Sequence, residues 1–102
     1  MAKIYDLEDG CPFTLMSYNE QHITRYLHRL NDYEKANGTG LSYHARVREY
    51  NKHDDTVLYH YQLVMRHRDG TEGALTDFAP GDTIRQMARA FVSSADLHHK
   101  YS

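Results

Sequence analysis

Two stretches of alternating residues, 41–50 and 56–66, constrain the fold of this chain more than any other part of the sequence. They read LSYHARVREY and TVLYHYQLVMR, and the polar segment NKHDD separates them. Alternation with a period of two residues is typical of antiparallel strands that bury one face. A further apolar stretch follows Arg68-Asp69-Gly70. The sequence therefore predicts an antiparallel sheet of three strands over residues 41–78.

Side-chain parity predicts how the first two strands pair, because a slip of one residue would turn one strand's apolar set to the wrong face. A loop of three or five residues around Lys52 to Asp54 preserves this parity. We expect Val47 opposite Tyr59 on the inner face and Arg46 opposite His60 on the outer face. The other expected pairs are Ala45 with Tyr61, Tyr43 with Leu63, and Arg48 with Leu58.

The second turn allows two registers. Asp69-Gly70 favours a two-residue type I′ loop, which would place Val64 opposite Leu75 on the outer face. A three-residue turn would instead bring Leu75 to the inner face. The sequence leaves both open.

The sequence predicts one amphipathic helix before the sheet segment and a second one after it. Ser17 and Glu20 form a capping box, apolar residues follow at helical spacing, and Gly38 supplies a stop, so we expect a helix over 17–37. A second helix is expected over 82–97, after the turn and N-cap of Pro80-Gly81-Asp82. Its apolar stripe consists of Ile84, Met87, Ala88, Phe91, Val92 and Ala95. We expect Phe91, at the centre of this stripe, to be almost fully buried.

Together these elements predict a single α+β domain over residues 1–102, with the order helix, three antiparallel strands, helix and both helices on one face of the sheet. Residues 1–16 are expected to form an irregular segment or a short edge strand. No apolar run approaches the roughly 18 residues of a membrane span. The N-terminus lacks the features of a secretory signal, and Cys11 is the one cysteine. We therefore expect a cytoplasmic protein, whose oligomeric state the sequence does not fix.

No catalytic, cofactor or metal motif accompanies these elements. The eight histidines and the single cysteine lack the paired spacing of structural zinc ligands. A set of nucleophile, base and acid is not discernible, and there is no glycine-rich phosphate loop. We therefore expect no enzyme activity, no cofactor and no metal.

The outer face of the predicted sheet has an unusual composition, since arginine and histidine surround two apolar residues. Interfaces concentrate their binding energy in apolar centres with arginine and tyrosine. We therefore expect this face to bind a partner, provided that the N-terminal segment does not cover it. The expected partner-binding residues are Arg46, Arg48, Leu58, His60, Val64 and Arg66.

The order helix, three strands, helix resembles that of small phage-encoded inhibitor proteins, including some anti-CRISPR proteins, in size and architecture. This resemblance implies a non-enzymatic inhibitor whose protein partner is a bacterial defence complex, such as a host nucleoprotein complex.

The same order, with VREYN in the first strand, is similar to the double-stranded-RNA-binding domain, which implies a nucleic-acid-binding accessory protein as the alternative. That family carries a Lys-rich, Ala-rich segment at the start of its last helix. This chain has Asp77 and Asp82 there, which would repel phosphate, and its net charge is −2.

Overall fold

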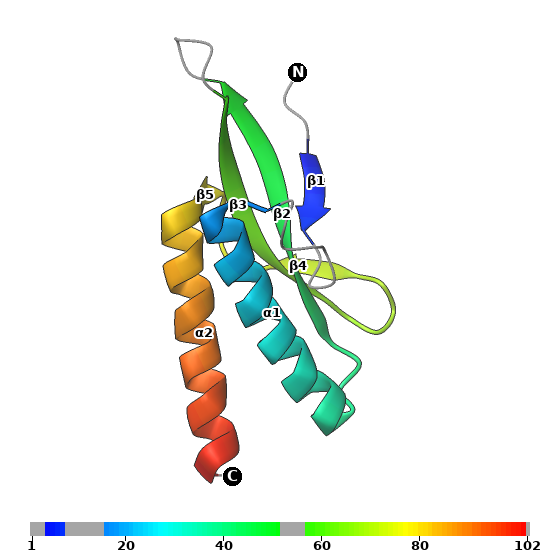
Figure 1. The fold of residues 1–102 in the computed structure, drawn as a ribbon. Helices are drawn as coiled ribbons and strands as arrows, with labels where there is room; N and C mark the ends of the chain where they lie inside the picture. The colour runs from blue at the N-terminus through cyan, green and yellow to red at the C-terminus, as the bar shows by residue number, and fades with distance from the viewer. Residues whose placement is uncertain (1–3, 8–15, 52–56, 102) are drawn as a thin grey trace.

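The two helices cover one face of an antiparallel sheet, as Figure 1 shows for this computed structural model. The structure describes residues 4–7, 16–51 and 57–101. The elements in chain order are β1 (Ile4–Leu7), α1 (Tyr18–Asn37), β2 (Ser42–Asn51), β3 (Val57–Arg66), β4 (Glu72–Ala74), β5 (Ala79–Pro80) and α2 (Gly81–Tyr101). The predicted α+β class and the order helix, sheet, helix are confirmed, and β1 is the short N-terminal strand.

The strands follow the order β1-β2-β3-β4. Strand β5 also pairs with β3, at residues 60–61, whereas β4 pairs with residues 64–66. The prediction of one continuous third strand up to residue 78 was wrong, because the chain bends between β4 and β5. At this bend the amide of Leu75 donates to the Leu63 carbonyl at 2.8 Å, and the amide of Leu63 donates to the Thr76 hydroxyl at 3.1 Å. A side-chain oxygen thus replaces the backbone carbonyl that a regular strand would have offered.

Pairing between β2 and β3 differs from the prediction by two residues. Val47 lies opposite Tyr61 rather than Tyr59, and Arg46 lies opposite Gln62 rather than His60. A shift of two residues keeps every side chain on its predicted face, so parity alone could not exclude it. The loop between these strands, including Lys52 and His53, lies outside the described residues.

The turn between β3 and β4 takes the three-residue form. The amide of His67 donates to the Thr71 carbonyl at 2.8 Å, and Gly70 has a φ of 91°, which is the left-handed conformation this turn requires. Val64 consequently lies opposite Ala74, so the three-residue alternative is the one that forms, and not the two-residue loop that would have paired Val64 with Leu75. Leu75 lies opposite Leu63 and therefore belongs to the inner face.

Helix α1 has the predicted limits. Its N-cap Ser17 accepts a hydrogen bond from the Glu20 amide at 3.4 Å, and Gly38 at the C-cap has a φ of 65°. Helix α2 continues beyond Leu97 to Tyr101, further than predicted. The extra turn packs on α1, since the ring of His99 stacks on Tyr33 with 4.1 Å between centroids. Tertiary contact therefore extends this helix.

The core lies between the helices and the inner face of β2 and β3. Its buried side chains include Ile23, Leu27, Ala45, Val47, Tyr61, Leu63, Ile84 and Ala88. Phe91 is 39% exposed, so the prediction that it is almost fully buried was wrong. The helical period places Phe91 on the apolar side, but within the described part of the chain β4 is too short to cover it. None of the described helices is long and apolar enough to cross a membrane.

Candidate functional site

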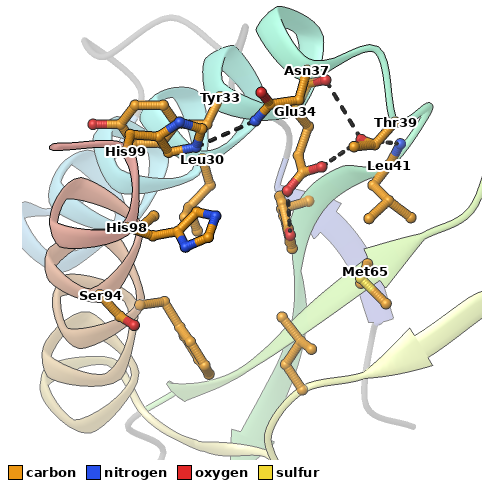
Figure 2. A pocket seen from close by; sticks show the side chains of 14 residues that line it. Leu30, Tyr33, Glu34, Asn37, Thr39, Leu41, Met65, Ser94, His98 and His99 are labelled. Atoms are coloured by element: carbon orange, nitrogen blue, oxygen red, sulfur yellow. Dashed lines mark hydrogen bonds between the residues drawn. The ribbon is translucent and has the colours of Figure 1, made fainter. Parts of the chain in front are cut away.

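A groove of about 840 Å³ opens between the C-terminal halves of α1 and α2 and the inner face of the sheet. Figure 2 shows Leu30 and Tyr33 on one wall, His98 and Ser94 on another, and Leu41 and Met65 across from them. The apolar lining residues are Leu30, Leu41, Met65, Leu75, Phe91 and Ala95. Leu75 and Phe91 are 36% and 39% exposed, so the groove offers apolar surface directly to solvent.

Polar side chains that are hydrogen-bonded to one another line the rim of the groove on the α1 side (Figure 2). The Glu34 carboxylate accepts hydrogen bonds from the Tyr43 hydroxyl at 3.0 Å and from the Thr39 hydroxyl. The Thr39 hydroxyl in turn accepts from the Leu41 amide at 3.2 Å. Burial, and then the hydrogen bond to Glu34, raises the pKa of Tyr43 to about 12. This rim is therefore neutral at Tyr43 and already hydrogen-bonded at Glu34, which leaves little for acid–base chemistry.

The C-terminal halves of the two helices contact each other beside the groove. The ring of Tyr33 stacks on that of His99, and the amide nitrogen of Asn37 lies 3.3 Å from Nε2 of His99. The Tyr33 hydroxyl donates to Asp96, and Arg29 Nε lies 2.9 Å from the same carboxylate oxygen. These hydrogen bonds, first that of Tyr33 and then that of Arg29, hold the pKa of Asp96 below its ordinary value. These contacts hold the C-terminal halves of α1 and α2 together beside the groove.

Sequence reasoning missed this groove because it assigned Phe91 to the closed core. The signal that could have found it is the three-residue turn, since that alternative turns Leu75 to the inner face. With Leu75 inside and the third strand broken after β4, the apolar side chains at this end of the sheet stay partly uncovered.

The predicted partner-binding residues do share the outer face of the sheet, but Glu72 of β4 compensates two of the charges. Nη2 of Arg46 donates to Oε1 of Glu72 at 2.9 Å, and Nη2 of Arg66 donates to Oε2 at 3.1 Å. Arg46 Nε also donates to Asp6 of β1 at 3.4 Å. These contacts hold the pKa of Glu72 below its ordinary value, through Arg46 first and Arg66 second.

The apolar centre expected on this outer face is smaller than predicted. Val64 is 1% exposed, so its assignment to an accessible contact surface was wrong, whereas Leu58 is 37% exposed. The guanidinium of Arg48 lies over the Phe78 ring at 4.4 Å, and His60 is half-buried opposite Arg48. The outer face therefore presents Leu58 beside arginines that already have partners within the chain.

His44 also lies on the outer face and is 1% exposed. Its Nε2 is 3.2 Å from Oε2 of Glu72 and 3.7 Å from Oδ1 of Asp6, without the geometry of a hydrogen bond. Among the described residues no group of three or more histidine, cysteine, aspartate or glutamate side chains is arranged to hold a metal ion. His53 and Cys11 lie outside the described residues, as do residues 8–15 of the N-terminal segment, and the sequence left open whether that segment covers the outer face.

Comparisons with known proteins assign no family to the chain. No family model matches it, and searches of curated proteins and of solved structures return no match. Function therefore has to be inferred from the groove and the surfaces themselves.

Proposed function

We propose that this protein is a non-enzymatic protein-binding module, of the kind represented by small phage-encoded inhibitors of bacterial defence complexes. The observation that carries the proposal is the open apolar groove, with Leu75 and Phe91 more than one third exposed. Contiguous exposed apolar surface of this kind marks interaction sites, because scattered single side chains are common but patches are not.

An apolar side chain on the surface of a partner protein is the ligand that this groove suits. Its apolar lining favours an aliphatic or aromatic anchor, and the fixed positions of Glu34, Tyr33 and His99 reduce the ordering that binding would otherwise require. Sites for small molecules enclose most of their ligand. An open groove instead suits an anchor that stays attached to a larger partner.

The alternative of a nucleic-acid-binding accessory protein has less support. Phosphate binding depends on cations that are available to a ligand. Arg46 and Arg66 both pair with Glu72, and Asp6 adds a further negative charge beside Arg46. Nothing in the described part of the outer face therefore favours a polyanion over a protein.

Two leucines of equal exposure provide a matched test. Leu75 is 36% exposed in the groove, and Leu58 is 37% exposed on the outer sheet face. The wild-type protein is used to capture a partner from a nuclease-treated bacterial lysate, and the affinity of the purified partner is then measured for Leu75→Glu and for Leu58→Glu. We expect Leu75→Glu to weaken binding at least about tenfold, or roughly 1.4 kcal/mol, and Leu58→Glu to bind as the wild type does.

Three outcomes would contradict the proposal. Loss of binding in Leu58→Glu alone would assign the site to the outer face. Loss of capture after nuclease treatment would favour the nucleic-acid alternative. Equal binding by both variants, with circular dichroism showing that both are folded, would remove the groove from consideration.

A further inference from the structure

A second cleft, of about 490 Å³, lies between α1 and α2 on the side of the helix layer that faces away from the sheet. All of its lining residues belong to the two helices, which run side by side in the same direction (Figure 1). Three arginines and two aspartates line it: Arg25, Arg29, Arg89, Asp32 and Asp96. Positive charge therefore exceeds negative charge in this cleft, although the net charge of the whole chain is −2.

The charges are unevenly distributed along the cleft. Both aspartates lie at the end nearer the C-termini of the helices, where Asp96 pairs with Arg29 at 2.9 Å. Toward the other end, Arg89 lines the cleft, and Arg85 lies one turn before it on the same side of α2. Within the described part of the chain, neither Arg85 nor Arg89 forms an ion pair. The positive charge of the cleft is therefore least compensated at these two arginines.

The placement of Arg85 and Arg89 is unfavourable in the chain alone. Two like charges four residues apart on a helix repel each other. The Arg85 guanidinium lies over the Tyr18 ring at 5.5 Å, while its Nε is buried and has no hydrogen-bond partner among the described residues. A buried donor without an acceptor is destabilising. Local departures of this kind are expected at binding sites, and here an anion would reduce the repulsion and supply an acceptor.

We propose that this cleft binds an acidic segment of a protein partner, with a glutamate or aspartate carboxylate held between Arg85 and Arg89. Arginine suits this ligand because its planar group presents paired N–H donors that match the two oxygens of a carboxylate. The exposed Tyr18 ring and the half-buried Tyr26 provide apolar surface beside the arginines for the rest of the segment. The proposal rests on the proposed function in taking the partner to be a protein, and it adds a contact separate from the groove.

The short extent of the positive charge favours a peptide over a nucleic acid. Proteins that bind nucleic acids commonly neutralise about six to ten phosphates. Arg85 and Arg89 are only about 6 Å apart along the helix axis, at 1.5 Å per residue. Asp82 precedes them on α2 and Asp96 follows them, so further phosphates along the helix would meet negative charge. A peptide can instead place one or two carboxylates at the arginines and uncharged residues beyond them.

NMR titration of the full chain with a blocked hexaglutamate peptide, at about 50 mM salt, tests the proposal through the arginine Nε–Hε resonances. We expect the resonances of Arg85 and Arg89 to shift, with a dissociation constant below about 5 mM. Arg85→Gln and Arg89→Gln should each weaken binding at least about threefold. Lys35→Gln removes the same charge from an exposed position of α1 outside the cleft, and should leave the affinity within about 1.5-fold of the wild type.

Three results would overturn the proposal. The first is no shift at Arg85 or Arg89 when the peptide reaches about 10 mM. The second is equal weakening by Arg89→Gln and Lys35→Gln in folded variants, as judged by circular dichroism, because general charge attraction would then explain the binding. The third is tighter binding of a hexathymidylate probe than of the peptide, which would assign the cleft to nucleic acid. Failure here leaves the groove untested, because Leu75 and Phe91 are unchanged in every variant.

Discussion

Replacing Phe91 with alanine should cost far less stability than a core substitution on the same helix, because the side chain lines an open groove. Burying a phenylalanine completely contributes up to about 3 kcal/mol. Phe91 is 39% exposed, so about three fifths of that contribution is available. The groove is already open, so truncation leaves no closed cavity to add to the cost. We expect Phe91→Ala to lower the free energy of unfolding by about 1–2 kcal/mol.

Ile84 provides the comparison within α2. It is 0% exposed and packs in the core between the helices and the sheet. Ile84→Ala should therefore lose both the transfer free energy and a cavity term, or about 2–5 kcal/mol in total. Chemical denaturation of both variants gives the two values directly.

A loss of about 3 kcal/mol or more in Phe91→Ala would contradict the partial exposure of this side chain. That result would mean that the phenyl ring is enclosed in solution and that the groove is closed. Equal losses in the two variants would have the same meaning, since the structure assigns them very different burial.

Two further predictions concern polar contacts. Asn31→Ala should destabilise the fold by about 1–3 kcal/mol, because the Asn31 side chain accepts a hydrogen bond from the Tyr43 amide at 2.6 Å and donates one to the Tyr43 carbonyl at 3.1 Å. As a control, Asp32→Ala at the exposed neighbouring position should lower the free energy of unfolding by less than about 0.5 kcal/mol. Similar losses for both variants in denaturant unfolding would contradict this role of Asn31. The lowered pKa of Glu72 means that its stabilising effect is present above the ordinary value of 4.5 and is lost as the pH falls through the lower folded-state pKa. The difference in melting temperature between the wild type and Glu72→Gln should therefore shrink as the pH falls from about 5.5 to 3, and a difference that stays constant would show that these ion pairs do not shift the carboxyl pKa.

Local signals explain why the secondary structure was largely predictable. Ser17 and Gly38 limit α1 through contacts within a few residues of the helix ends. Alternation likewise assigned β2 and β3 side chains to the correct faces, because a strand has a period of two. The same period explains the register error, since Val47 reaches the inner face equally well opposite Tyr59 or Tyr61.

Features that depend on tertiary contacts were not predictable in the same way. The break after β4 depends on the Thr76 hydroxyl reaching the amide of Leu63, and the last turn of α2 depends on His99 stacking on Tyr33. Phe91 is exposed because the sheet does not extend over it. The helical spacing of apolar residues in α2 carries no information about how far the sheet extends. The groove results from these features together, and for that reason the sequence pointed to the outer face instead.

Methyl NMR of the leucine and methionine side chains distinguishes binding in the groove from binding on the outer face, because one titration reports on both faces of the sheet. The groove contributes Leu41, Met65 and Leu75, and the outer face contributes Leu58. On addition of a purified partner protein, we predict that the methyl resonances of the groove residues shift or broaden while those of Leu58 stay unchanged. Shifts confined to Leu58, with the groove methyls unaffected, would show that the partner binds the outer face and not the groove.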